Sequence, residues 1–329
     1  MKNVKQYNIL VTGVGAIIGY GVIASLRKSK YDCNIIGMDI FYDAVGQVWC
    51  DKFVQAILAA DKEYIPFLKK QMDKHDIDLV FFGTEQEINK CYECQEELGE
   101  YYKKLVINNG RLIKLAEDKW ETACFLKANG LKYIPSSITS SFEDAKSEFG
   151  VPLLMKPRRS YASKGICKVT TKEEFDSWKA EYNDQFMVQK LIGDEEHEYT
   201  AATFGFGDGS CIKPIVMRRK LSKAGATDKA VVEAVPEIDE EIYAISKVLK
   251  PYGPTNFQFR LADDEYFLLE INPRISSSTS IRTAFGYNEA EMCIEYFMEG
   301  KKPIDRKLRT GKAYRYIADM VKYNDSNNI

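Results

Sequence analysis

The sequence predicts a mixed fold class, with an α/β domain first and α+β units after it. Strand-like and helical segments alternate over residues 1–110, which favours a parallel sheet with helices on its faces. After Asp118, strands follow one another closely with flanking helices, a pattern typical of α+β units. At roughly 150 residues per domain, the 329 residues are enough for two or three domains.

The elements of the first domain are defined by short apolar runs and by glycines. The run NILVT predicts a strand that ends in a glycine turn, and the apolar residues beyond this turn predict a helix. We expect strands over 8–12, 34–39 and 78–82, with 106–108 as a candidate fourth strand, and helices over 17–26 and 64–74.

The later elements are delimited by glycines and by alternating apolar residues. Gly130 and Gly150 are each expected just beyond the end of a helix. We expect helices over 118–129, 142–149, 172–182, 240–249 and 289–298, strands over 153–155, 166–169, 186–190 and within 199–219, and a β-hairpin over 256–272.

The composition is that of an ordinary globular protein and argues against several classes of function. Lys plus Arg total 46 and Asp plus Glu total 48, so there is no global positive field to hold nucleic acid. No apolar run approaches the ~18 residues that a membrane span needs. The polar N-terminus shows no signal peptide, so we expect a cytoplasmic protein.

The cysteines and histidines form no recognisable metal motif. Cys91 and Cys94 are the one CxxC pair among eight cysteines, and neither a second pair nor a histidine lies near them. Incidental cysteines on a helix are therefore favoured over structural zinc or redox chemistry. The presence of only two histidines excludes a His-rich zinc site and argues against Ser-His-Asp catalysis.

A glycine turn near the N-terminus offers one candidate nucleotide site. Gly13, Gly15 and Gly19 follow a strand and open a helix, and Asp39 closes the next strand. This arrangement is similar to a dinucleotide fingerprint, in which glycines let the backbone approach a pyrophosphate. The spacing is GxGxxxG rather than GxGxxG, so a tight turn without a dinucleotide is favoured over NAD(P) binding.

The expected hairpin over 256–272 alternates polar and apolar side chains. A three-residue loop, Asp263 to Glu265, would place Gln258 opposite Glu270 and would place 256 opposite 272. A two-residue loop would slip the register and mix the two faces, so the alternation favours the longer loop. One face then carries Gln258, Glu270 and Asn272, and the other carries Phe257, Phe259, Leu261, Leu269 and Ile271.

The favoured register brings one carboxylate and two amide oxygens together, with opposed Cβ atoms about 5 Å apart. Such hard oxygen ligands suit Mg²⁺ or Mn²⁺, with phosphate oxygens completing the coordination. A single protein carboxylate cannot neutralise the ion, so an anionic partner such as ATP is implied. The alternative is a solvated polar face, but Arg274 and the hydroxyl run 276–280 favour an anion site.

Lysines and loops elsewhere could complete this anion site. Lys156 ends an apolar strand, and Lys119 opens a helix, where the helix dipole disfavours a cation unless an anion is near. The cationic loop 158–165 could fold over phosphates as a lid. Backbone amides near the end of strand 186–190 could read an adenine edge. Each lysine alone is better explained by exposure to solvent, but with the hairpin they form one pattern.

Together these motifs resemble the ATP-grasp superfamily, and most closely one synthetase unit of the carbamoyl-phosphate synthetase large chain. The hairpin carries the resemblance, with NFQF at 256–259 and EINPRISSS at 270–278. Asp118-Lys119, LLMKP at 153–157 and VQKLIG at 188–193 precede it in the family order. The resemblance covers about residues 1–300 and includes a Rossmann-like unit of the kind that precedes ATP-grasp domains.

The resemblance implies a role for each motif residue. The implied catalytic residues are Lys156, Arg219 and Arg274, and Arg218 and Lys223 lie in the same substrate-facing segment as Arg219. Two departures from the family pattern are that Gly165 is the only glycine of the phosphate loop and that Gln189 replaces the usual Glu. The implied ligands of two divalent ions are Gln258, Glu270 and Asn272. The implied ATP contacts are Lys119, Lys156, Ser163, Gly165, the hinge residues Gln189, Lys190, Leu191 and Ile192, the ribose acceptors Glu196 and Glu198, and Lys223, Gln258 and Glu270.

The resemblance also implies an architecture and a function. The expected domains are a Rossmann-like pre-ATP-grasp domain at 1–112, a small ATP-grasp subdomain at 113–187, a large subdomain with the metal hairpin at 188–300, and a C-terminal extension at 301–329. The expected function is an ATP-dependent ligase that joins a small carboxylate to an amine or thiol through an acyl phosphate. It would require Mg²⁺ or Mn²⁺ and no nucleic acid or membrane partner, and the family suggests a homodimer.

Two alternatives stay open from the sequence. The first is an NAD(P)-binding oxidoreductase that uses the turn from Gly13 to Gly19. The second is a nucleotide-binding regulator without turnover, although the complete set of Gln258, Glu270 and Asn272 argues against it.

Overall fold

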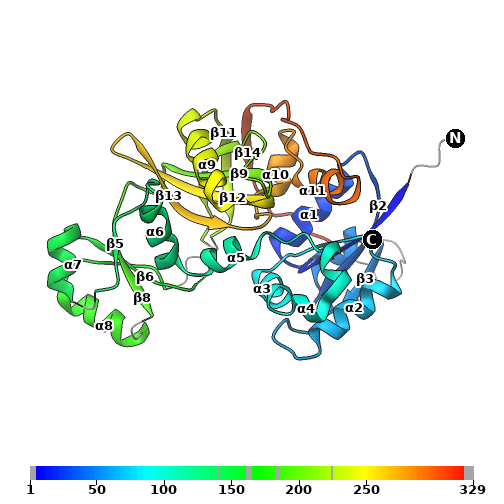
Figure 1. Ribbon diagram of the computed structural model, residues 1–329, viewed down its shortest axis with the longest axis horizontal. Coiled ribbons are helices and arrows are strands. Elements are labelled where there is room, and N and C mark those ends of the chain that lie inside the picture. Colours follow the sequence, from blue (N-terminus) through cyan, green and yellow to red (C-terminus); the bar gives the residue numbers. More distant parts are fainter. Residues whose placement is uncertain (1–4, 140, 161–164, 183–184, 224, 322–329) are drawn as a thin grey trace. The chain divides into compact units, whose positions relative to one another are not determined.

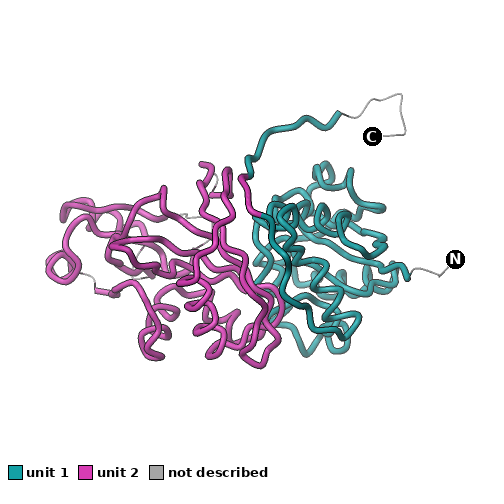
Figure 2. The backbone as a smooth tube through the Cα atoms, turned by 90° about the horizontal axis from the view of Figure 1, so that it is seen from above, with its two compact units in different colours: residues 1–108, 274–309, 313–329 teal, residues 109–273, 310–312 magenta. Residues whose placement is uncertain are grey.

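The structure is a computed structural model that describes residues 5–139, 141–160, 165–182, 185–223 and 225–321. Its two compact units are drawn in teal and magenta in Figure 2. Unit 1 comprises residues 1–108, 274–309 and 313–329, and unit 2 comprises residues 109–273 and 310–312. The segment 274–309 therefore belongs with the N-terminal residues, a division that the order of the sequence motifs does not indicate.

Unit 1 is built on a parallel four-stranded sheet with strand order β3-β2-β1-β4. This confirms the predicted α/β class of the N-terminal region (Figure 1). Its elements are β1 (Gln6–Thr12), α1 (Ile17–Arg27), β2 (Asp32–Asp39), η1 (Val45–Trp49), β3 (Lys52–Gln55), α2 (Tyr64–Lys74), β4 (Leu79–Phe81), α3 (Glu85–Glu93), α4 (Gln95–Leu98), η2 (Gly99–Lys104), α10 (Thr279–Ala284), α11 (Glu289–Cys293) and η3 (Ile294–Met298).

Two strands of unit 1 differ from the sequence prediction. The candidate strand over 106–108 is absent, because only an isolated bridge between Val80 and Leu105 forms there. Strand β3 was not predicted, since its four residues KFVQ show no strong alternation. It forms because its backbone pairs with the edge of β2.

The late segment of unit 1 covers helix α1. The Asn288 side chain donates to the backbone oxygen of Ser25 at 2.8 Å, and the Thr283 hydroxyl donates to the Ser25 hydroxyl at 2.8 Å. Arg282 and Glu289 form an ion pair at 3.3 Å that is fully buried. Residues 274–309 therefore supply part of the core of unit 1.

Unit 2 contains two antiparallel sheets. The smaller sheet has the order β5-β8-β6-β7, and the larger sheet has the order β13-β12-β9-β10-β11-β14. The elements are α5 (Gly110–Glu117), α6 (Lys119–Ala128), β5 (Ser136–Ser137), α7 (Phe142–Phe149), β6 (Leu153–Pro157), β7 (Cys167–Val169), α8 (Lys172–Tyr182), β8 (Phe186–Lys190), β9 (Glu198–Phe206), β10 (Ile215–Leu221), β11 (Thr227–Val232), α9 (Pro236–Leu249), β12 (Tyr252–Ala262), β13 (Glu265–Asn272) and β14 (Gly311–Tyr314).

Each sheet of unit 2 buries one apolar face. In the smaller sheet, Phe175 of α8 lies in a core of aromatic and aliphatic side chains with Phe142 of α7. In the larger sheet, Ile238 and Ile242 of α9 belong to the same core cluster as Phe257 of β12. The alternation along the strands directs polar side chains to the opposite face of the larger sheet.

The hairpin β12–β13 confirms the predicted pairing of the candidate ligand residues but not the predicted length of the loop. Asn256 pairs with Asn272 and Gln258 pairs with Glu270. The turn has only two residues, Asp263 and Asp264, both with positive φ, and Ala262 pairs with Glu265. A β-bulge between Gln258 and Phe259 absorbs the one-residue difference.

The bulge also changes which leucine of β13 enters the core. Phe259 pairs with Leu268, which is 4% exposed and belongs to the core cluster. The prediction that Leu269 lies on this face is wrong, because the bulge makes Leu269 the extra residue. Leu269 is half-buried and lines a pocket instead.

The structure also locates the CxxC cysteines and bears on metal clusters and membrane-spanning helices. Cys91 is buried in α3 and Cys94 lies at the end of this helix. The described residues contain no group of three or more His, Cys, Asp or Glu side chains that could hold a metal ion. Over the same residues, no helix has the length and apolar character that a membrane crossing needs.

Candidate active site

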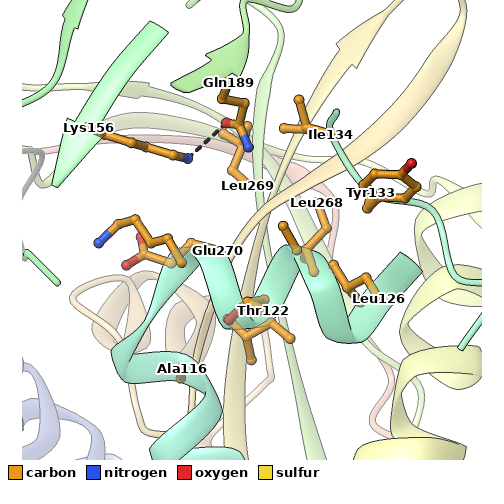
Figure 3. A pocket seen from close by; sticks show the side chains of 13 residues that line it. Ala116, Thr122, Leu126, Tyr133, Ile134, Lys156, Gln189, Leu268, Leu269 and Glu270 are labelled. Atoms are coloured by element: carbon orange, nitrogen blue, oxygen red, sulfur yellow. Dashed lines mark hydrogen bonds between the residues drawn. The ribbon is translucent and has the colours of Figure 1, made fainter. Parts of the chain in front are cut away.

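A pocket in unit 2 brings together several of the residues predicted to bind ATP. Lys119, Lys156, Gln189 and Glu270 line it, and they come from α6, β6, β8 and β13. Figure 3 shows Lys156 and Gln189 on one side of this pocket and Glu270 on another. Apolar side chains complete the wall, among them Leu126, Tyr133, Ile134, Leu268 and Leu269.

Lys156 is a buried cation held by a neutral amide. Its Nζ donates to Gln189 Oε1 at 2.8 Å, and Gln189 Nε2 donates to the Ser136 hydroxyl at 2.8 Å (Figure 3). Burial and, to a smaller extent, the nearby Lys119 cation lower the pKa of Lys156 to about 8, while Glu270 acts in the opposite direction. A polyanion in the pocket would supply the negative charge that Gln189 lacks.

Lys119 stands at the start of α6, where Asp118 is the N-cap. The Asp118 carboxylate accepts from two backbone N–H groups of α6 and from the Arg158 guanidinium at 2.7 Å. Although burial opposes it, these hydrogen bonds hold the pKa of Asp118 below its usual value. Lys119 Nζ donates to the Ser160 backbone oxygen at 2.7 Å, so α6 is tied to the first residues of loop 158–165.

A row of polar side chains crosses the larger sheet beside the predicted metal ligands. Arg219 Nη2 donates to Gln258 Oε1 at 2.8 Å and to Glu198 Oε1 at 2.7 Å. Arg260 donates to the other carboxylate oxygen, Glu198 Oε2, at 2.8 Å. Both oxygens of Glu198 are thus paired with arginines in a nearly buried network.

The hairpin residues fit a divalent cation. The cross-strand pair Gln258 and Glu270, with Asn272 two residues along β13, supplies one carboxylate and two amides. Gln258 Oε1 accepts one hydrogen bond from Arg219, and an amide oxygen has a second lone pair. Glu270 also lines the pocket with both lysines, so a cation there would lie where phosphates would be held.

The remaining predicted residues lie in different environments. Arg274 is in unit 1, where its Nη2 lies 2.5 Å from Glu85 Oε1. Arg218 pairs with Glu233 at 3.0 Å, and Lys223 is exposed. Gly165 has φ +77°, and its backbone oxygen accepts from Trp178. Ser163 lies outside the described residues.

The hinge and ribose candidates follow β8. Ile192 is buried and Leu191 is half-buried, whereas Lys190 is exposed. Of the two acidic candidates, Glu196 is exposed and Glu198 is buried among arginines. Glu196 is therefore the one whose carboxylate is accessible.

The sequence reasoning missed some residues of this region. Arg260 lies two residues after Gln258 in an alternating strand, so the period of two was a signal for its shared face. Ser136, which orients Gln189, and the pocket residues Tyr133 and Ile134 belong to a segment without periodicity. Only the folded path of that segment brings them to the pocket.

Comparison with known proteins finds a likeness to ATP-grasp proteins both in the sequence and in the fold. Residues 184–320 match the model of the family described as "ATP-grasp in the biosynthetic pathway with Ter operon". The carbamoyl phosphate synthase large chain of Thermotoga sp. (strain RQ2) is 25% identical over an alignment of 233 residues, with a coverage of 58% of this chain and 20% of the relative. The chain thus spans about a fifth of the length of this curated relative.

Solved structures of low sequence identity share the fold. N5-carboxyaminoimidazole synthetase from Staphylococcus aureus matches with a TM-score of 0.73 and 17% identity, covering 93% of this chain and 81% of that chain. L-amino acid ligase from Bacillus licheniformis matches with a TM-score of 0.67 and 16% identity, covering 90% and 74% of the two chains. These likenesses confirm the predicted fold class.

Proposed function

We propose that this protein is an ATP-dependent ligase that joins a small carboxylate to an amine through an acyl phosphate. The observation that carries the proposal is the hairpin register, which pairs Gln258 with Glu270 while Glu270 shares a pocket with Lys119 and Lys156. Ligases among the similar structures, such as the L-amino acid ligase, support the same class of reaction. A thiol acceptor is a variant of this proposal.

In the proposed reaction, an oxygen of the substrate carboxylate attacks the γ-phosphorus of ATP. The bond from this phosphorus to the bridging oxygen breaks, and ADP leaves. The amine nitrogen then attacks the acyl carbon and expels phosphate, and the amide forms as the nitrogen loses a proton. Positioning and electrostatics carry such transfers, so no general base of the protein is needed.

The residues of unit 2 have distinct proposed roles. Lys156 and Lys119 bind the phosphates, and the buried position of Lys156 strengthens its attraction to them. Gln189 orients Lys156, residues 190–192 form the adenine hinge, and Glu196 accepts the ribose hydroxyls. Arg219 holds Gln258. Arg274, which belongs to unit 1, is assigned to the transferred phosphoryl group on the motif alone.

Gln258, Glu270 and Asn272 would hold Mg²⁺ or Mn²⁺, and the family resemblance suggests two ions. When bound, such ions offset the charge that develops on the phosphates. The protein's own contribution is to hold the three side chains in register through the ladder of β12 and β13.

The decisive experiment measures ADP release from ATP and Mg²⁺ in a screen across amino acids and carboxylated sugars with amine acceptors. Glu270→Gln should abolish the activity that this screen finds, because it removes the one carboxylate of the ligand set. Glu265→Gln changes an exposed carboxylate of the same strand and should leave the rate unchanged. Full ADP release by the Glu270→Gln variant would refute the metal assignment.

The alternative of NAD(P)-dependent oxidoreduction is disfavoured by Asp39. The N–H of Gly15, which would face a pyrophosphate, donates to Asp39 Oδ2 at 2.7 Å. A thermal-shift titration should therefore show stabilisation by ATP and Mg²⁺ and none by NADH. A regulator without turnover would show the same thermal shift but no ADP release with any substrate.

A further inference from the structure

Unit 1 contains a cleft that the nucleotide chemistry proposed for unit 2 does not use. It lies at the carboxyl ends of β1, β2 and β4, where Gly13, Asp39 and Thr84 line it. Its volume is about 700 Å³. Ligand pockets commonly measure roughly 300–1,000 Å³ and occur at this edge of parallel sheets, where the strand order reverses.

The walls of the cleft are apolar and open to solvent. Phe41 is 63% exposed, Val45 40% and Leu58 60%, and all three line the cleft. Phe41 and Val45 come from the segment after β2, Val45 as the first residue of η1, and Leu58 comes from the loop after β3. Because large apolar side chains rarely gather on a surface without a reason, these walls indicate a binding partner with apolar surface.

The floor of the cleft carries two nearly buried carboxylates. Glu87 is 8% exposed and accepts hydrogen bonds from the hydroxyls of Tyr64 at 2.9 Å, Thr84 at 2.8 Å and Thr12 at 2.5 Å. Asp39 is 6% exposed and accepts from the N–H groups of Gly15 and Phe41. All five donors are neutral groups.

The negative charge of this floor has no counter-charge. The residues that line the cleft include Asp39, Asp43 and Glu87 but no lysine, arginine or histidine. Within the described part of the chain, none of these three carboxylates forms an ion pair. Burial raises the pKa of Glu87 despite its hydroxyl donors, as expected for a carboxylate without a cationic partner.

We propose that this cleft binds a small organic cation, a primary amine with an apolar body. Its ammonium group would lie at Asp39 and Glu87, and its apolar body would lie against Phe41, Val45 and Leu58. A phosphate or carboxylate would meet like charge on this floor. The site lies wholly within unit 1, so the proposal does not depend on ATP turnover.

The test is calorimetric titration of the full chain without nucleotide, with 2-phenylethylamine, isoamylamine and tyramine as probes. The matched probes are 2-phenylethanol, which lacks the charge, ethylamine, which lacks the apolar body, and 3-phenylpropanoate, which reverses the charge. At least one of the three amines should bind. Each matched probe should bind at least about tenfold more weakly than the amine of highest affinity. Absence of binding by all three amines, or equal binding of the matched probes, would overturn the proposal.

Two variants locate the binding. Leu58→Lys places a competing cation at the cleft on a side chain that is 60% exposed, so the fold should survive and amine binding should be lost. Ile304→Lys is the matched control, because Ile304 is 72% exposed in the same unit and does not line the cleft. Equal amine affinity in both variants would place the binding elsewhere and sink the proposal.

Because the readout is binding without ATP, the two proposals fail separately. Loss of ADP release in Glu270→Gln with unchanged amine binding would support both. Amine binding in a chain that turns over no ATP with any substrate would contradict the ligase alone.

Discussion

Lys156 is the residue whose charge state couples most directly to the proposed chemistry. Its amine has a folded-state pKa of about 8, below the ordinary 10.5, because the pocket buries it without an anionic partner in contact. Between these two pH values the unfolded chain binds more protons than the folded chain. The cost of burying the charge is thus present below pH 8 and is relieved as the pH rises toward 10.5.

We expect the affinity for ATP and Mg²⁺ to fall as the pH rises above about 8, because the neutral amine no longer attracts phosphate. Gln189→Glu should move this fall to higher pH, since a carboxylate beside Lys156 raises its pKa. Lys156→Arg stays charged and should give a flat profile over the same range. Fluorescence titration at several pH values measures this, and identical profiles in all three proteins would contradict the assignment.

Glu198 lies between two arginines, and we expect its charge to contribute to stability. Glu198→Gln should destabilise the chain by about 3–5 kcal/mol, because it leaves buried Arg219 and Arg260 short of a counter-charge. Glu233→Gln, just after β11, is the control, since its partner Arg218 is 42% exposed and the expected loss is ~1 kcal/mol or less. Urea unfolding compares the two, and equal losses would count against the buried network.

At the scale of elements, the hairpin combines a tight turn with a bulge. A two-residue turn with both residues at positive φ matches the twist of antiparallel strands, so it is favoured over a longer loop. The bulge then restores the pairing of Gln258 with Glu270. The site depends on both features together.

The two adjacent leucines of β13 test this arrangement. Leu268→Ala should cost about 2–5 kcal/mol, because Leu268 is buried in the core of the larger sheet. Leu269→Ala should cost clearly less, because Leu269 is half-buried at the pocket. Denaturant unfolding gives both values. A three-residue loop without a bulge would reverse their order.

The elements that the sequence predicts well are those with their own periodicity. Helices α2, α7 and α8 and strand β8 have the predicted bounds. Strands β3 and β11 were missed, because KFVQ and TDKAVV become strands only by pairing with neighbours. The pairing of Gln258 with Glu270 was predictable, because only this register puts the polar side chains of both strands on one face. The turn length was not predictable, because a shorter turn with a bulge gives the same pairing as a longer turn without one.

The pairing of polar residues was less predictable than their positions. The sequence indicates Glu198 and Arg219 as site candidates, but it does not show that Arg219 binds both Glu198 and Gln258. Such contacts depend on the order β12-β9-β10 in the sheet. Strand order is a non-local property that residue spacing does not specify.

At the scale of the whole molecule, unit 1 is discontinuous in sequence. A chain that ends after Pro273 would lack α10 and α11, and it would expose the face of α1 that they cover. We expect unit 1 of this truncated chain to be digested rapidly in limited proteolysis, with the fragments identified by mass spectrometry.

A chain that ends after Arg309 is the matched control, because it keeps segment 274–309. It should resist digestion of unit 1 as the full chain does. Equal resistance of both truncated chains would show that residues 5–108 form a stable domain without the late segment.

The discontinuity of unit 1 has a consequence for synthesis on the ribosome. Residues 109–273 are contiguous, so unit 2 can complete its core, apart from the edge strand β14, as soon as they emerge from the exit tunnel. The N-terminal residues emerge earlier, but α1 stays uncovered until α10 and α11 have emerged. Nascent unit 1 therefore presents apolar surface throughout the translation of unit 2, which makes it the part of the polypeptide most in need of a chaperone.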